Sequence, residues 1–232
     1  MEQNKFNNIK IIMIYLVVFG HFLGRQSWDN ILTQNLLKII YIFHMPVFVI
    51  TSGYLYGKSK KKYLKNIVNT TLIAFLVFQG IYIVFKGVTG EINNLMQLLR
   101  EIITPGAVNW YILCLFYWKL IIKKIEKNKI TIIVLLIIPI ITGMVPFISD
   151  EFALAKALKY FIYFYLGYIA YNKDLMRNYY KYNNKLSFLT LAIVILLLTL
   201  INKVSVNQIA VVSSYSELGM SIIYGMINRI YI

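Results

Sequence analysis

Lys10 and His21 are the residues of this sequence whose types and spacing point most directly to chemistry. The ten residues between them, IIMIYLVVFG, are apolar. Eleven residues make about three turns of a helix, so both side chains project from one face, about 16 Å apart along the axis. An imidazole is suited to general-base catalysis near neutral pH, and an ammonium group can hold an anionic ligand. Asn7 lies on the same face and extends this polar stripe.

The second histidine of the chain, His44, precedes a proline in the stretch IIYIFHMPVFVITSGYLYG. Pro46 has no backbone N–H, so the carbonyl of Ile42 loses its helical partner, and we expect the helix to bend or open locally beside His44. Counted from the inner ends of their helices, His21 and His44 lie at about 18 and 20 Å. The two rings are therefore expected to meet at one height. The structural alternative is that each histidine only hydrogen-bonds a freed carbonyl.

The composition is that of an integral membrane protein. Of 232 residues, 59% are hydrophobic and 14% are charged, whereas a soluble domain carries about 25% charged residues. We predict an all-α fold, a polytopic membrane bundle of about eight helices in a single domain over residues 1–232. The stretches that are long enough to cross a bilayer lie near 9–26, 38–57, 66–86, 108–122, 130–148, 157–171, 186–202 and 207–228. Ionisable residues in such helices are costly and usually face the bundle interior, which favours a functional role for Lys10 and the histidines.

The positive charge is distributed unevenly between the two sides of the predicted bundle. With a cytoplasmic N-terminus, 17 of the 24 Lys and Arg residues lie inside, mostly at 58–65, 119–129 and 172–185. This asymmetry predicts a multi-pass protein of the bacterial plasma membrane in that orientation. The net charge of +15 then reflects topology and contact with the lipid bilayer, and no nucleic-acid partner is expected. Cys114 is the only cysteine, so neither an internal disulfide nor a metal cluster is expected.

Two further features lie towards the predicted outer face. Trp110 and Tyr111 open the fourth stretch, where they bind a ligand or anchor the helix at the membrane interface. Residues 87–107 are partly amphipathic and are predicted to form an interfacial or re-entrant helix. Lys10 lies at the opposite boundary. The alternative to a ligand-binding role is that its side chain reaches towards lipid headgroups, as lysines there commonly do.

Four blocks of the sequence, KIIMIYLVVFGH, FHMPVFVITSGYL, NWYILCLFYW and YFIYFYLGYIAY, resemble in order the signatures of the membrane acyltransferase-3 family. The resemblance covers most of residues 5–171 and is strongest to the saccharide O-acetylase branch, which includes fucose 4-O-acetylase-like proteins. The family's motifs fall on Lys10 and His21, on His44, Met45 and Pro46, on Ser52, Gly53 and Tyr54, and on Trp110 and Tyr111.

The resemblance implies transfer of an acyl group, usually acetyl from acetyl-CoA, to a sugar hydroxyl of a cell-surface glycan or its lipid-linked precursor. Acyl-CoA is then a donor substrate, and no bound cofactor or metal is implied. The implied catalytic residues are His21 and His44. The residues implied to contact acyl-CoA or the acceptor are Lys10, Asn7, Trp110, Tyr111 and Ser52.

The chain departs from the family's pattern in two ways. Asn7 stands where many relatives have an aspartate, and relatives are typically longer, so the C-terminal part is expected to be shortened. Two other functions are compatible with the same residues: a transporter or exporter of glycan or lipid-linked intermediates, and an inactive truncated relative. Incubating membranes with labelled acetyl-CoA and candidate glycans would separate an acyltransferase from both.

Overall fold

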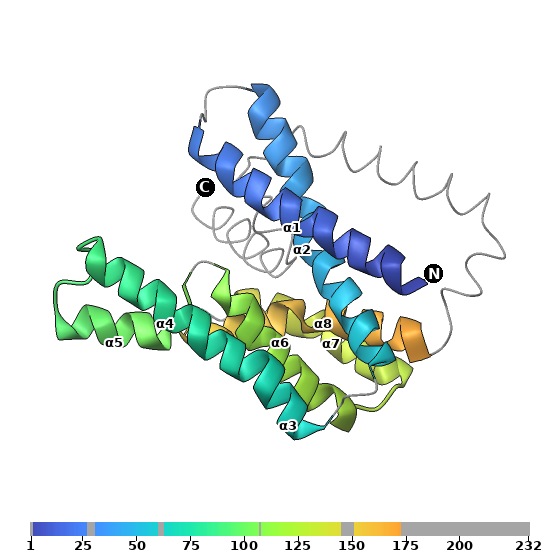
Figure 1. The fold of residues 1–232 in the computed structure, drawn as a ribbon. Helices are drawn as coiled ribbons and strands as arrows, with labels where there is room; N and C mark the ends of the chain where they lie inside the picture. Colours follow the sequence, from blue (N-terminus) through green and yellow to red (C-terminus); the bar gives the residue numbers. More distant parts are fainter. Residues whose placement is uncertain (1, 27–30, 60–62, 107, 145–150, 173–232) are drawn as a thin grey trace, which may run out of the picture. The chain divides into compact units, whose positions relative to one another are not determined.

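The computed structural model describes residues 2–26, 31–59, 63–106, 108–144 and 151–172. All regular structure in these residues is helical (Figure 1), which confirms the all-α class. The elements are α1 (Glu2–Gln26), α2 (Ile31–Lys58), α3 (Leu64–Ile67), η1 (Val68–Leu72), α4 (Ile73–Val88), α5 (Leu95–Ile103), α6 (Asn109–Ile121), η2 (Ile122–Lys124), α7 (Lys129–Met144), η3 (Glu151–Ala153) and α8 (Leu154–Asn172).

As far as the described residues extend, the first six predicted stretches lie on helices, and the stretches 186–202 and 207–228 lie outside the described residues. Within the described part of the chain, one helix is both long and apolar enough to cross a membrane. This is Leu64–Val88, in which α3, the π-helical turn η1 and α4 follow one another without a break. The segments Asn7–Leu23 and Lys129–Thr142 are apolar but shorter. The eight-helix membrane bundle and its orientation therefore stay predictions.

The chain divides into two compact units, which are described separately. The first contains residues 1–58 and the chain from Tyr163 onwards, and the second is Ser59–Ile162. Helix α8 contributes its first half to the second unit and its last ten residues to the first.

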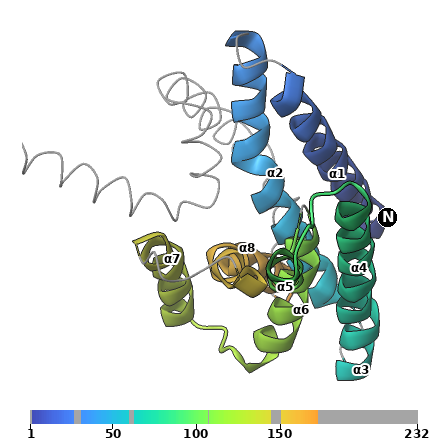
Figure 2. The same ribbon diagram turned by 90° about the vertical axis from the view of Figure 1, so that its left-hand side faces the viewer.

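In the first unit, α1 and α2 lie side by side and run antiparallel (Figures 1 and 2). The Lys10 ammonium lies 5.4 Å from the centroid of the Phe48 ring. Farther along α1, a Cβ added at Gly20 would lie 3.2 Å from the Tyr41 ring. The Tyr41 hydroxyl donates a hydrogen bond to the Gly20 carbonyl at 3.4 Å. The absence of a side chain at Gly20 thus allows a tyrosine of α2 to pack directly on the backbone of α1.

The other face of α2 packs on the second half of α8 through glycines. A Cβ at Gly53 would overlap the carbonyl oxygen of Phe164, and a Cβ at Gly167 would overlap that of Ile50. Small residues of this kind allow two helix backbones to approach closely. Aromatic rings flank the contact, with Tyr56 5.9 Å from Phe164 between centroids.

In the second unit, α6 is held against the start of α8 by side-chain donors. The Trp118 indole N–H donates to the Ala157 carbonyl at 2.8 Å, and the Cys114 thiol lies 3.6 Å from the Ala153 carbonyl oxygen. Trp118 and Cys114 are fully buried. Both buried donors are satisfied by carbonyls in the first turn of α8 or just before it, so neither is left without a partner away from water.

Candidate functional site

His44 is buried in the middle of α2 and is held in one orientation. Its Nδ1 lies 2.7 Å from the carbonyl oxygen of Ile40, one turn earlier. A carbonyl oxygen can only accept a hydrogen bond, so Nδ1 carries the proton and donates it. In the neutral ring the lone pair is then on Nε2. This hydrogen bond therefore fixes both the tautomer and the orientation of the His44 ring.

Of the bend or local opening expected at Pro46, the structure shows no opening. Helix α2 continues through this residue as one element from Ile31 to Lys58. The Pro46 ring is buried, and neighbouring groups in packed helices compensate for the missing donor. His44 also bonds a different carbonyl from the one that the proline frees, because side chains in helices point towards the N-terminus and reach the residue four positions back.

His21 is exposed on α1, one residue beyond the contact of Gly20 with α2. Gly20 faces Ile40 and Tyr41, which precede His44 by about one helical turn, or about 5 Å along the axis. The structure therefore places the two histidines one turn apart in height rather than level.

Tyr41 contacts both His44 and the backbone of Gly20, the residue before His21, and the sequence reasoning missed it. Its ring centroid lies 5.4 Å from that of His44, with an angle of 42° between the planes. Its hydroxyl bonds to Gly20, the neighbour of His21. The signal was present, because residues three apart on a helix share a face. Tyr41 thus contacts both the backbone of α1 and the buried imidazole of His44.

The remaining predicted residues of the first unit lie on the same two helices. Lys10 is half-buried beside Phe48, and Asn7 is exposed one turn nearer the start of α1. Ser52 is buried, and its hydroxyl donates to the Phe48 carbonyl at 2.9 Å. The structure thus gathers Lys10, Asn7 and both histidines on one helix pair, while the Ser52 hydroxyl bonds within its own helix.

Trp110 and Tyr111 belong to the second unit, at the start of α6. The Trp110 ring lies 5.6 Å from that of Tyr160, and the Lys156 ammonium lies 5.9 Å from the Trp110 centroid. Tyr111 packs edge-on against Trp110 and Trp118, at 6.2 and 6.1 Å. The two predicted ligand-binding aromatics therefore take part in an aromatic cluster of their own unit. Among the described residues, no group of three His, Cys, Asp or Glu could hold a metal ion.

The structure thus places a lysine and two histidines on two adjacent helices of an all-helical protein, with the tautomer of His44 fixed by a hydrogen bond. Residues 3–226 match an acyltransferase domain. The chain belongs to the acyltransferase-3 family, as the motifs indicated. A stretch of 53 residues is 45% identical to the nodulation protein NolL of Sinorhizobium fredii (strain NBRC 101917 / NGR234). That stretch covers 22% of this chain and 14% of NolL. No solved structure shows significant similarity.

Proposed function

We propose that this protein is a membrane O-acyltransferase that moves an acetyl or other acyl group from acyl-CoA to a hydroxyl group of a saccharide. The acceptor belongs to a cell-surface glycan or its lipid-linked precursor. The match of residues 3–226 to an acyltransferase domain supports the type of reaction. The observation that carries the site is the packing of α1, with Lys10 and His21, against the Tyr41–His44 face of α2.

Lys10 is the proposed contact for the donor. Coenzyme A is an anion with several phosphates, and the half-buried Lys10 ammonium beside Phe48 is a suitable point charge for one of them. The acyl-pantetheine arm then extends along α1 for the roughly 16 Å that separate Lys10 from His21 on that face. This brings the thioester to the histidines, with the donor entering from the cytoplasmic side.

His21 is the proposed base because it is the exposed histidine of the pair. It takes the proton of the acceptor hydroxyl while that oxygen attacks the thioester carbonyl. The carbon–sulfur bond then breaks, and the CoA thiolate takes the proton back from the imidazolium. His44 offers its Nε2 lone pair to stabilise the protonated ring, and Tyr41 keeps the His44 ring in position. Transient acylation of His21 is a second route through the same residue.

The test is acyl transfer by membranes that contain the full chain, supplied with labelled acetyl-CoA and candidate glycans. We expect His21→Ala to lower turnover by about 100-fold or more, because a general base acts in the transition state. The matched control is Phe22→Ala, which removes an exposed side chain of the same helix and is expected to leave turnover unchanged. Equal activity of the wild type and His21→Ala would overturn this mechanism.

Two variants test the rest of the stripe. Lys10→Ala is expected to raise the KM for acetyl-CoA with little change in kcat, because a phosphate contact contributes to ground-state binding, and Lys10→Arg is expected to retain most of that binding. Asn7→Asp restores the carboxylate of the family's pattern and is expected to raise activity. Glycan export without any acyl transfer would instead identify a transporter.

A further inference from the structure

Helix α5 carries an apolar stripe that its own unit leaves uncovered. Leu95, Leu99 and Ile102 project from one face of the helix, with exposed fractions of 71%, 45% and 50%. Met96, beside them, is 75% exposed. Gln97 and Arg100 lie on the remaining exposed side of the helix. Exposed apolar stripes of this kind on a short amphipathic helix are typical of a surface that contacts lipid or a protein partner.

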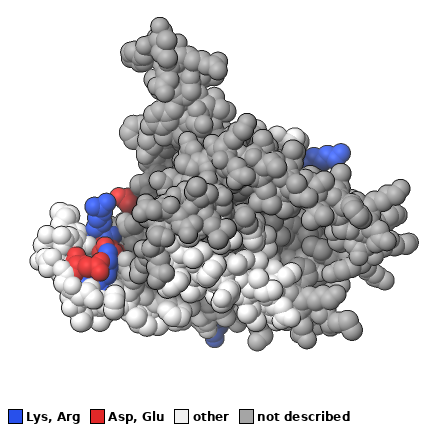
Figure 3. All heavy atoms as spheres, turned by 90° about the horizontal axis from the view of Figure 1, so that it is seen from above, with Lys and Arg blue, Asp and Glu red and all other residues white. Residues whose placement is uncertain are grey.

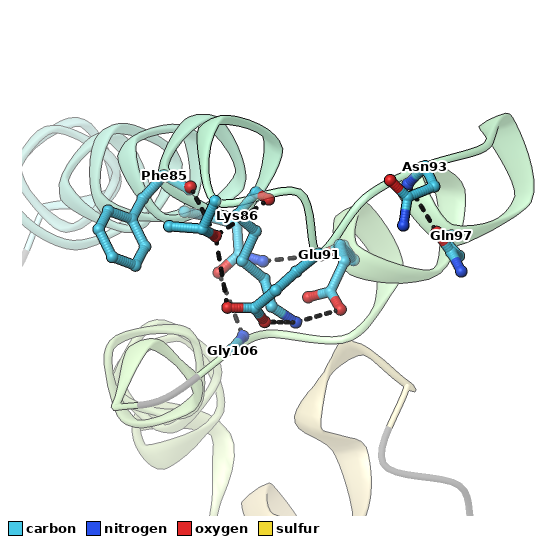
Figure 4. Close-up of polar contacts among 9 residues, drawn as sticks. Phe85, Lys86, Glu91, Asn93, Gln97 and Gly106 are labelled. Carbon is cyan, nitrogen blue, oxygen red and sulfur yellow. Dashed lines mark hydrogen bonds and ion pairs between the residues drawn. The ribbon is translucent and has the colours of Figure 1, made fainter.

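A different face of α5 is fastened to α4. The Gln79 side chain donates to the Glu101 carbonyl at 2.8 Å, and the Lys86 ammonium contacts the Glu101 carboxylate at 2.6 Å. Lys86 also lies 3.6 Å from Glu91 in the turn after α4. Figure 4 shows Lys86 and Glu91 together at this turn, and Figure 3 shows acidic and basic side chains side by side at the end of the molecule where α4 and α5 meet.

These contacts determine how far α5 runs back along α4. Gln79 lies nine residues before Val88, the end of α4, which is about 13 Å along the axis. The Gln79 side-chain oxygen accepts hydrogen bonds from the Gly106 N–H at 3.4 Å and from the Asn109 side chain at 3.0 Å. The chain that leaves α5 is therefore already level with Gln79, and α6 begins there. This explains why the fourth apolar stretch is short.

The opposite side of α4 is apolar and exposed. Ile73, Val77, Ile81, Val84 and Val88 follow one another at helical spacing, about half a turn away from Gln79 and Lys86. They belong to the described helix that is long and apolar enough to span a bilayer. If α4 is in the bilayer, its last three turns and α5 beside them lie at the same depth.

We propose that α5 is a re-entrant helix in the leaflet at the carboxyl end of α4, with Leu95, Leu99 and Ile102 in contact with phospholipid acyl chains. In the orientation predicted from the basic loops, this is the outer leaflet. Glu101 joins the helix to α4 through Lys86 and Gln79, so that the apolar stripe faces lipid while Gln97 and Arg100 lie towards the headgroups and water. The inference rests on α4 crossing the membrane and not on any catalytic activity.

The experiment places a nitroxide on single cysteines in the full chain, reconstituted into phosphatidylcholine and phosphatidylglycerol vesicles, in a Cys114→Ala background. Leu99→Cys and Leu95→Cys probe the stripe, Gln97→Cys is the matched control on the same helix, and Val84→Cys reports on α4. We expect collisions with oxygen to exceed collisions with a water-soluble nickel complex at positions 99, 95 and 84. The ratio is expected to invert at position 97.

Several outcomes overturn the proposal. Nickel accessibility at positions 99 and 95 equal to that at 97 would place α5 in water. Inaccessibility of both positions to either reagent would mean that protein, such as a second copy of the chain, covers the stripe. Nickel accessibility at position 84 would show that α4 does not lie in the bilayer. Adding Glu101→Gln to the Leu99→Cys variant is expected to raise nickel collisions at the label, and no rise would mean that the ion pair does not hold α5 in the leaflet.

Discussion

The middle of α2 and the junction of α4, α5 and α6 satisfy their polar side chains in opposite ways. In α2, Thr51 donates to the Val47 carbonyl at 2.7 Å, and Ser52 and His44 likewise bond carbonyls four residues back. At the junction, Gln79 bonds to groups of three other segments, the Glu101 carbonyl, the Gly106 N–H and the Asn109 side chain.

The difference shows what holds each region in place. A hydrogen bond within one helix satisfies a buried hydroxyl but does not attach that helix to its neighbours. Helix α2 instead fits its neighbours closely at glycines, with Gly53 and Gly167 in the contact with α8 and Gly20 in the contact with α1, where the Tyr41 hydroxyl adds one hydrogen bond. The junction is attached by hydrogen bonds and an ion pair between elements. Each mode of attachment predicts a different sensitivity to substitution.

The largest effect is expected at the close glycine contacts between α2 and α8. Gly53→Ala and Gly167→Ala each place a methyl group on a backbone carbonyl that cannot move aside. Each is expected to lower the free energy of unfolding by about 3 kcal/mol. The measurement is unfolding in detergent by SDS titration, monitored by circular dichroism.

The control for the glycine variants is Gly80→Ala in α4, where nothing lies within 4 Å of an added Cβ. This change is expected to raise the free energy of unfolding by about 0.5 kcal/mol, because alanine is the better helix former. Equal stability of the Gly53→Ala and Gly80→Ala proteins would show that α2 and α8 do not depend on this close contact.

An intermediate effect is expected at the junction. Gln79→Met keeps the length of the side chain but removes its bonds to Glu101, Gly106 and Asn109. The free energy of unfolding is expected to fall by about 2 kcal/mol, because partners that are excluded from water lose their hydrogen bonds. The same SDS titration measures it. A loss no greater than that of a surface substitution would contradict the role of Gln79 as the centre of the junction.

The smallest effect is expected in α2. Thr51→Val removes a buried hydroxyl, but the Val47 carbonyl keeps its helical partner, so the free energy of unfolding is expected to change by no more than about 0.5 kcal/mol. Ser52→Ala is expected to behave alike in the same titration. Acyl transfer by the Ser52→Ala protein sharpens the comparison, because a fall in turnover at unchanged stability would assign the hydroxyl a contact with substrate. If Thr51→Val or Ser52→Ala lowered the free energy of unfolding as much as Gln79→Met, the two regions would not differ in how their polar side chains contribute to stability.

Most of the secondary structure could be predicted because its causes are local. Apolar runs of sufficient length indicated helices over the first six stretches, and the amphipathic pattern of residues 87–107 predicted a helix where α5 lies. The Lys10–His21 spacing and the FHMP block also identified the family. These features depend on residue type and helical periodicity, which neighbouring elements do not alter.

The register between the helices was decided only by the tertiary structure. Counting from the ends of apolar runs placed His21 and His44 level, but the fit of Tyr41 on Gly20 sets them one turn apart. The role of Tyr41 and the depth of α5 beside Gln79 follow from such contacts in the same way. A sequence states which face of a helix is polar, whereas the position along its neighbour depends on how side chains and glycines of both helices fit together.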